Sequence, residues 1–488
     1  MNIILQLIII LYFMTLTKSN LIVPLKYIHI NASDSEIKND FLSNLYSKYL
    51  YMNITIGSNK EVIKGILNMT QTGFLIYENS YNYNSSISFM KNNKTESFYK
   101  RNYEEGYKSN DTICLDIINN KNKNSKIEKC KNEKKVSFAL MKAKQKNLEI
   151  NLYENYSIIG LQQNDYFDEN VIPLFIHSLK VANIVDSYLF SIEYNKEEKN
   201  NDFDAYLLLG NDSQVSDNME IIKYSTERKF GYPYWGINFD QICVGINNSY
   251  DKSKENNYQS FYHTGVEFDA TLPYIVGIYE YNIYIKFNFF YDLLSEKICQ
   301  YMAAPINPDY STFVCDSKST KFIEAMKKFP KLFFVDIYSN ITFVLDKNDL
   351  FSYNPNNNSD TQIYFLILFY NHNNQYDEIT QFKLGIPFFK KYKFSFNSDD
   401  RVMNYYEKTI PNKKDTDTDT DAGTDKDKSK KNYKNIISIV VVVFLLILFF
   451  ILGILFHKNI IKLPRKKKAN ELDDDDYEYT DKLEINKD

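Results

Sequence analysis

Residues 54–77 read "ITIGSNKEVIKGILNMTQTGFLIY", and this stretch decides the fold of the chain. Alternating apolar residues run into Gly57, and a second apolar run at 63–67 follows a polar turn. The pattern predicts two strands joined by a tight turn. The second strand runs into Asn68, which opens the polar segment N-M-T-Q-T at residues 68–72.

Length and composition place limits on the class of protein. The chain has 488 residues, of which 44% are hydrophobic and 25% are charged, with a formal net charge of -4. This length is sufficient for two bodies with cores of their own. The near-neutral charge balance gives no reason to expect nucleic acid as a partner.

The region between residues 45 and 408 reads as mostly strand. Short apolar or alternating runs are separated by polar turns, which is typical of an all-β arrangement. These runs are "LFSIEY", "AYLLLG", "YWGINFDQICVG", "ITFVL", "QIYFLILFY" and "KFSFN". Helical patterns are expected only at residues 288–302 and 319–329. The composition therefore predicts a mainly β fold with a few short helices.

Two apolar segments predict the cellular location of the protein. Residues 1–19 resemble a cleaved signal peptide, and residues 436–456 are long and apolar enough for a transmembrane helix, which needs about 20 residues. The basic residues that follow within 457–488 predict a cytosolic tail by the positive-inside rule. Residues 409–435 read as a polar stalk. We therefore expect a single-pass type I membrane protein of the secretory pathway, in the endoplasmic reticulum, a later compartment or the cell surface.

The five cysteines agree with a lumenal location. We expect disulfides Cys114–Cys130 and Cys299–Cys315, each closing about 15 residues and worth roughly 3 kcal/mol in the loop-entropy model. Cys243 is left over, either buried as a thiol or engaged with another chain. Asn-x-Ser/Thr sequons, such as the one at Asn340, are compatible with a glycoprotein.

The order of sequence landmarks resembles the pepsin-like aspartic peptidases, and among them the membrane-anchored branch typified by plasmepsin V. The resemblance covers nearly the whole of residues 45–408. It rests on eight segments in the family's order: "YLYMNITIGSNKEVIKGILN" (49–68), "YEEGYKSNDTICLDII" (103–118), "YSIIGL" (156–161), "SYLFSIEYN" (187–195), "DAYLLLGND" (204–212), "YWGINFDQICVG" (234–245), "FPKLFFVDIYSNITFVLDKNDLF" (329–351) and "FKLGIPFFKKYKFSFNSDDRVMNY" (382–405).

The resemblance implies a bilobal pepsin-like fold. It predicts an N-terminal extension at 20–44, an N-terminal lobe at 45–195 and a C-terminal lobe at 196–408. The family's chemistry uses two carboxylates, one from each lobe, that share one proton and activate a water. A gap-free alignment from Gly57 puts Asn68 on the first of these positions, where an amide cannot deprotonate water. M-T-Q-T at 69–72 replaces the T-G-S-S that follows in the family.

The second carboxylate position is open to three alignments of "YHTGVEFDATLPYI". The preferred alignment places Glu267 there, one methylene longer than aspartate. A two-residue slip would use Asp269 instead, and a rival frame puts His263-Thr264-Gly265 on the family's D-T-G. No frame restores D-[ST]-G, so the motifs that carry the chemistry are degenerate.

Two functions therefore remain open. The first is a pseudoprotease that is anchored in the membrane by one transmembrane helix and binds an extended peptide or a protein in the interlobe cleft, with Tyr103 in the place of the family's flap tyrosine. The second is an active aspartic-type endopeptidase, a hydrolase with an unconventional dyad that includes Glu267 or Asp269. Neither function implies a cofactor or a metal. In both, Asn68, Glu267 and Asp269 are the candidate site residues, and ordinary loop positions are the bland alternative.

Overall fold

The computed structural model describes residues 21–30, 41–98, 104–118, 126–142, 156–162, 173–195, 203–210, 219–225, 228–229, 232–233, 235–247, 249–251, 253–254, 258–261, 264–303, 308–353, 361–370, 381–398 and 400–408. The chain divides into two units, 1–410 and 411–488, and all of these residues belong to the first. The predicted signal peptide (1–19), stalk (409–435), transmembrane helix (436–456) and tail (457–488) lie outside them. Within the described residues, no helix is long and apolar enough to cross a membrane.

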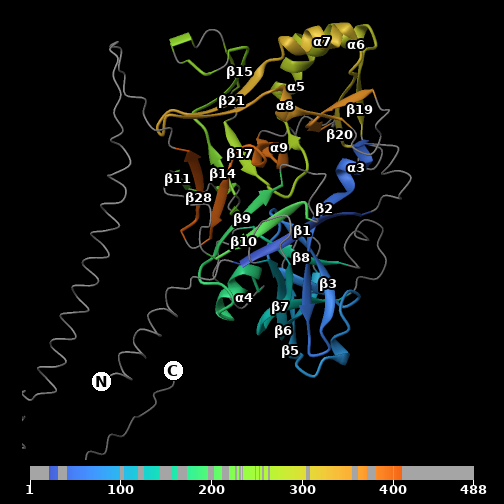
Figure 1. The fold of residues 1–488 in the computed structure, drawn as a ribbon, viewed down its shortest axis with the longest axis vertical. Coiled ribbons are helices and arrows are strands. Elements are labelled where there is room, and N and C mark those ends of the chain that lie inside the picture. Colours follow the sequence, from blue (N-terminus) through green and yellow to red (C-terminus); the bar gives the residue numbers. More distant parts are fainter. Residues whose placement is uncertain are drawn as a thin grey trace, which may run out of the picture. The chain divides into compact units, whose positions relative to one another are not determined.

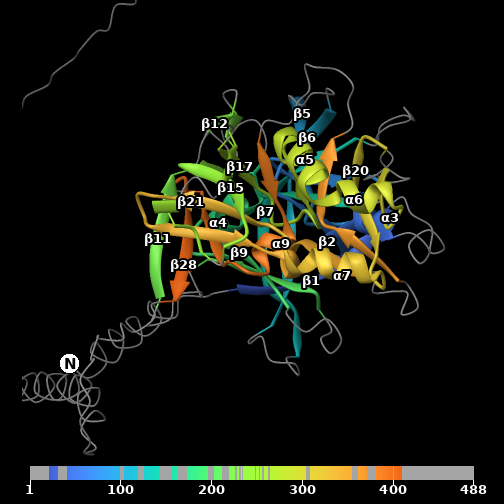
Figure 2. The same cartoon turned by 90° about the horizontal axis from the view of Figure 1, so that it is seen from above.

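The described part of the chain is mainly β, as the composition predicts. Figures 1 and 2 show the strands of the first unit with a few short helices beside them. The largest sheet has 13 described strands, in the spatial order β11 (Met219–Ser225), β28 (Val402–Lys408), β27 (Phe394–Asn397), β9 (Leu189–Tyr194), β10 (Ala205–Leu209), β1 (Leu21–His29), β2 (Lys48–Ile56), β3 (Glu61–Asn68), β8 (Ser157–Gly160), β4 (Phe74–Tyr77), β7 (Ile127–Met141), β6 (Glu104–Ile118) and β5 (Met90–Phe98).

The other described sheets come from residues 228–384. One runs in the order β14 (Gly236–Asn238), β17 (Gly265–Phe268), β26 (Phe382–Leu384), β18 (Ile275–Val276), β25 (Ile367–Tyr370), β20 (Tyr310–Asp316), β24 (Gln362–Phe365) and β23 (Phe351–Tyr353), and β19 (Cys299–Ala303) pairs with β20. Another has the order β16 (Gln259–Phe261), β15 (Gln241–Gly245), β21 (Lys331–Asp336) and β22 (Ile341–Leu345). β12 (Arg228–Lys229) and β13 (Tyr232–Pro233) form a two-stranded ribbon.

The helices are short. They are α3 (Phe41–Ser47), the 3₁₀ turn η1 (Tyr83–Ser85), α4 (Phe175–Val181), α5 (Tyr279–Ile285), the π-turn η3 (Lys286–Phe290), α6 (Tyr291–Ser295), α7 (Thr320–Lys327), α8 (Lys347–Leu350) and α9 (Ile386–Phe389). In α7 the Ser319 side chain accepts a hydrogen bond from the Phe322 N–H, which caps the helix where the sequence predicts its start. Figure 1 draws α5, α6 and α7 together, on the side of the first unit opposite β5 and β6.

The apolar segments form strands because the sheets bury their side chains, at alternate positions in β22 and on both faces in β9. The "LFSIEY" segment is β9, "ITFVL" is β22, and "QIYFLILFY" is divided into β24 and β25 at Leu366. The helix expected at 288–302 was misplaced. It begins at Tyr279 and ends at Ser295, and the residues after it, Cys299–Ala303, form β19. These residues pair in antiparallel register with β20, which overrides their helical pattern.

The segment at 20–44, expected as an extension, contributes a strand of the large sheet. β1 pairs with β2 along residues 26–29 and with β10 along residues 21–25. Its side chains Val23 and Leu25 are fully buried in the main hydrophobic core. That core also contains residues of β17, β26 and β21, so it joins strands from both ends of the described chain.

Both predicted disulfides are present. Cys114–Cys130 joins β6 to β7 with a Cα–Cα distance of 4.9 Å, and Cys299–Cys315 joins β19 to β20 with 4.0 Å. Each therefore links two neighbouring strands of one sheet. Cys243 lies buried in β15, outside both disulfides.

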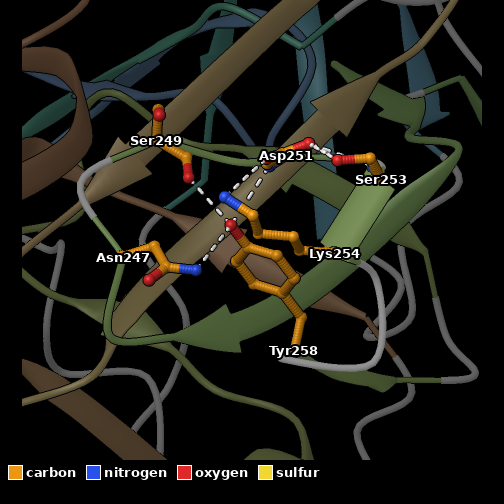
Figure 3. A network of polar contacts seen from close by, with 6 residues as sticks. All are labelled: Asn247, Ser249, Asp251, Ser253, Lys254 and Tyr258. Carbon is orange, nitrogen blue, oxygen red and sulfur yellow. Dashed lines mark hydrogen bonds and ion pairs between the residues drawn. The ribbon is translucent and has the colours of Figure 1, made fainter.

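A polar network organises the segment between β15 and β16 (Figure 3). The Tyr258 hydroxyl donates to the Ser249 carbonyl at 2.8 Å, and accepts from the Asp251 N–H at 3.1 Å and from the Asn247 Nδ2 at 3.2 Å. Asp251 in turn accepts from the Ser253 hydroxyl at 2.6 Å and lies 3.3 Å from the Lys254 ammonium. These contacts fold the segment onto the Tyr258 ring, so we assign the network a structural role.

Candidate functional site

Two strand crossings of the same topology meet at the site. In the first, β3 turns into β4, and β8 lies between them, parallel to β3 and antiparallel to β4. In the second, β17 turns into β18, and β26 lies between them, parallel to β17 and antiparallel to β18. The same motif therefore occurs twice, about 200 residues apart in sequence.

A glycine closes each crossing. A Cβ atom on Gly160, at the end of β8, would come within 2.6 Å of the backbone oxygens of Gln71 and Gly73. A Cβ atom on Gly385, directly after β26, would lie 1.9 Å from the Tyr274 oxygen. Only glycine lets these backbones approach so closely. The glycines of "YSIIGL" and "FKLGI" thus have the same role: each allows two backbone segments of its crossing to approach closely.

The turns of the two crossings are built alike. The Asn68 Oδ1 accepts hydrogen bonds from the Thr70 N–H at 2.8 Å and from the Thr70 hydroxyl at 2.9 Å. The Asp269 Oδ1 accepts from the Thr271 N–H at 3.0 Å and from the Thr271 hydroxyl at 2.6 Å. Asn68 and Asp269 therefore hold matching positions, one with an amide and one with a carboxyl group.

The residues that follow connect the two turns directly. The Ala270 N–H donates to the Met69 Sδ at 3.1 Å, and both side chains are buried. Nearby, the buried Trp235 donates its Nε1–H to the Leu161 carbonyl at 2.7 Å, and the Phe268 N–H donates to the Trp235 carbonyl at 2.6 Å. The two crossings are thus fixed against each other by contacts between distant parts of the chain.

A cavity of about 340 Å³ opens beside these turns. Asn68 and Thr70 line it from the first turn, and Asp269 and Thr271 line it from the second. The remaining wall is polar and aromatic: Tyr46, Lys48, Tyr49, Leu67, Glu267, Leu272, Pro273, Tyr274, Val276, Tyr310, Gln381 and Lys383. Its volume lies within the range of small-ligand sites.

An ion pair lies on this wall next to Asp269. Glu267 and Lys383 are register partners on the parallel strands β17 and β26, and the Lys383 Nζ lies 3.1 Å from the Glu267 Oε1. Burial by itself lowers the pKa of Lys383, but the carboxylates of Glu267 and Asp269 more than offset this and raise it. Lys383 therefore stays protonated as a fixed cation in the cavity.

Asp269 is the more deeply buried carboxyl group. Burial raises its pKa, while Lys383 and the hydrogen bonds from Thr271 act in the opposite direction. Glu267 raises the pKa further because it carries the same charge. Since Glu267 and Lys383 neutralise each other, an ionised Asp269 is a surplus negative charge in a buried place.

Three tyrosines supply hydroxyl groups to the same cavity. The ring of Tyr46 from α3 packs against Tyr274 at 5.0 Å and against Tyr310 at 6.1 Å between centroids. Burial raises the pKa of all three hydroxyls, so they remain donors near neutral pH. The Tyr46 hydroxyl is buried and has no hydrogen-bond partner within the described structure.

The structure brings Asn68, Glu267 and Asp269 to one cavity. Of the two carboxyl groups, only Asp269 repeats the contacts of Asn68, because Glu267 lies inside β17, two residues before the turn. The frame that uses His263-Thr264-Gly265 would need a turn before β17, whereas the turn follows β17. His263 and Tyr103 lie outside the described residues.

Lys383 is the site residue that the sequence analysis missed. The available signal is a single lysine between Phe382 and Leu384 in an otherwise apolar strand. A cation at such a position requires a partner when its strand is buried. In the same way Glu267, between Val266 and Phe268, is an isolated acid in an apolar strand.

The chemistry of this arrangement differs from that of a shared-proton dyad. Asn68 can accept and donate hydrogen bonds but cannot take a proton from water at neutral pH. Asp269 is the one carboxyl group at the two turns, and its charged neighbours are Lys383 and Glu267, which form an ion pair with each other. The described residues contain no group of three or more His, Cys, Asp or Glu side chains placed to hold a metal ion.

Comparison with protein-family models and with curated proteins gave no match. No protein-family model matches the chain. No curated protein matches it either. The function is therefore inferred from the sequence motifs and from the geometry described above.

Proposed function

We propose that the chain is a membrane-anchored, bilobal, pepsin-like aspartic protease homologue that binds peptide or protein in its interlobe cleft without cutting it. The observation that carries the proposal is the match between Asn68 and Asp269. Each sits in the turn of one of two equivalent crossings, and the two turns are joined through Met69 and Ala270. The repeated crossing is what a bilobal fold of this family requires, with one lobe around each crossing.

The absence of catalysis follows from the side chains at the two turns. The reaction needs one carboxylate to activate water and a second, protonated one to polarise the scissile carbonyl. Here an amide takes the first place. Asp269 holds the second place, and its raised pKa favours the protonated form, but no carboxylate lies at the first turn to activate water.

Peptide binding does not depend on a dyad. An extended peptide is held through main-chain hydrogen bonds, and side-chain pockets supply selectivity. Asn68, the three tyrosines and Thr70 offer donors and acceptors along one cavity. The unpartnered Tyr46 hydroxyl supports a ligand with a polar group at that place.

The proposal is tested with the full chain in detergent, by fluorescence anisotropy with a library of labelled extended peptides. We expect weak to moderate binding that weakens in Tyr103→Ala, the family's flap position. Tyr338→Ala is the matched control because Tyr338 is 93% exposed on the turn between β21 and β22. Failure of every peptide to bind would remove the peptide-binding function.

The active endopeptidase is the second candidate, and one observation favours it. Glu267 and Asp269 both line the cavity, so two carboxyl groups are present, one in β17 and one in the turn directly after it. Cleavage of a bound peptide by the wild-type chain, lost in Glu267→Ala or in Asp269→Asn, would select this function over the pseudoprotease.

A further inference from the structure

Helices α5, η3 and α6 form one continuous helical segment that is apolar on two sides. On the inner side Tyr281, Ile285 and Phe290 are fully buried in the main core. The outer side exposes a row of large apolar residues, which we call the aromatic stripe: Tyr279 is 51% exposed, Ile283 40%, Phe287 59% and Tyr291 59%. A surface helix of a globular protein normally has a polar outer face.

The helix geometry keeps the stripe straight. Its members are spaced four residues apart, and in an α-helix side chains at this spacing rotate by about 40° per step around the axis. The π-turn at Lys286–Phe290 has a wider turn and reverses this drift, so that Phe287 and Tyr291 stay aligned with Tyr279. The rings of Phe287 and Tyr291 lie 6.4 Å apart, as expected for neighbours on one face.

The stripe is small for a protein partner. The stripe rises about 18 Å from Tyr279 to Tyr291, and a helix is about 10 Å wide, which gives a face of roughly 200 Å². A stable protein–protein interface buries about 800 Å² on each partner. A contact of this size is too small to hold a separate protein, but it can form on a surface to which the chain is already attached.

The sequence outside the described residues supplies such a tether. After β28 the chain continues through residues 409–435 to the apolar run at 436–456. Those 27 intervening residues can span at most about 90 Å, so a bilayer holding residues 436–456 lies within reach of the described unit. Tyrosine and phenylalanine rings are the side chains that favour the boundary between headgroups and acyl chains.

We propose that the aromatic stripe docks on the surface of the bilayer that holds the C-terminal apolar segment, with the Tyr279, Phe287 and Tyr291 rings at the headgroup–acyl boundary. The inference rests on the membrane anchor of the proposed function. The neighbouring helix α7 is linked to α6 through the Lys321–Glu296 ion pair at 2.6 Å and ends in Lys327. It also exposes Ile323, and both views draw α6 and α7 side by side (Figures 1 and 2).

The test uses the single tryptophan of the chain, which is buried at Trp235 and provides a constant background. Phe287→Trp adds a reporter within the stripe at a side chain that is 59% exposed, and Tyr338→Trp adds one at a control site on the β21–β22 turn that is 93% exposed. The full-length variants are reconstituted into phosphatidylcholine vesicles with or without bromine atoms on the acyl chains, which quench tryptophan on contact. Flotation of the vesicles measures the anchor in the same samples.

We expect both variants to float with the vesicles, and brominated lipid to reduce the added emission of Phe287→Trp at least about twofold more than that of Tyr338→Trp. Flotation with equal quenching at the two sites would overturn the docking inference and leave the anchor intact. Absence of flotation would overturn both. Quenching at residue 287 that disappears when Ile283 and Tyr291 are changed to serine would show that the whole stripe makes the contact.

Discussion

Asn68 and Asp269 accept the same two hydrogen bonds, each from the backbone N–H and the hydroxyl of the threonine two residues later. The two accepting side chains thus differ in a single atom, the amide nitrogen of Asn68 in place of a carboxyl oxygen of Asp269. This difference makes the two positions natural controls for each other in experiments on charge.

Asp269→Asn tests the cost of burying the surplus charge. Because the folded pKa of Asp269 is raised, the folded protein holds its proton more tightly than the unfolded chain. Its contribution to stability is therefore favourable at low pH and is lost as pH rises through the folded pKa. We expect Asp269→Asn to melt at a higher temperature than wild type near neutral pH, with a difference that shrinks on acidification.

The asparagine at 269 keeps the Oδ1 acceptor for Thr271, as Asn68 does for Thr70. Thermal unfolding followed by circular dichroism at several pH values gives the comparison. A variant that is less stable than wild type at every pH would show that the carboxylate is needed for the fold. Asp186→Asn is a control at an exposed carboxyl group.

Asn68→Asp restores the missing carboxyl group and is expected to give no turnover. Thr70 still stands where the family has a glycine, and the Glu267–Lys383 ion pair still lies beside Asp269. Residues that act as a unit do not recover one at a time. The added charge and the lost Nδ2 donor should instead weaken peptide binding, by about fivefold or more if one hydrogen bond of about 1 kcal/mol is lost.

Binding and cleavage by Asn68→Asp are measured on the same labelled peptides, with Asn82→Asp as a control on an exposed turn. Measurable cleavage by the single variant would mean that Asn68 alone blocks the chemistry. Unchanged binding would show that Asn68 does not contact the ligand.

The Cys299–Cys315 disulfide holds the edge strand β19 on β20. Replacing both cysteines with alanine should lower the free energy of unfolding by about 3 kcal/mol, as expected for a loop of this length. Denaturant titration of the full chain measures the change. Cys243→Ala is the matched control, and a loss as large in Cys243→Ala would mean that packing rather than the crosslink is responsible.

Gly385→Ala tests the close approach in the second crossing. The new Cβ would lie 1.9 Å from the Tyr274 oxygen and 2.3 Å from the Leu272 oxygen, both of which belong to the backbone. We expect a loss of several kcal/mol or failure to fold. Gly65→Ala is the comparison, since its Cβ meets only side-chain atoms of Ile159 and Ile54, which can shift at a cost of about 1–3 kcal/mol. Equal losses at the two sites would contradict the crossing geometry.

Much of the fold could be read from the sequence because alternation marks a strand with one buried face. β9, β22 and β27 follow their apolar patterns, and the disulfides follow from short loops between cysteines. The start of the long helical segment could not be read, because residues 279–294 are apolar on both faces and show no clear helical period. That double-sided pattern is the same feature that gives rise to the aromatic stripe.

The candidate site was only partly predictable. Asn68 follows from one unambiguous strand end, whereas Glu267 and Asp269 are two residues apart and point to the same side of β17. A period-2 pattern cannot distinguish them. Two structural observations distinguish Glu267 from Asp269: the pairing of Glu267 with Lys383 across β17 and β26, and the contact of Asp269 with Thr271. The first depends on a strand more than 100 residues away in the sequence. Lys383 could be assigned to the site only once the register of β17 with β26 was known.

The fate of a bound peptide tests the central claim most directly. The full-length wild-type chain is incubated at mildly acidic pH with a peptide that it binds, and the peptide is then analysed by mass spectrometry. The account predicts that the peptide is recovered intact after many binding and release events. Recovery of defined cleavage products that disappear in Asp269→Asn would contradict it and identify the chain as an active endopeptidase.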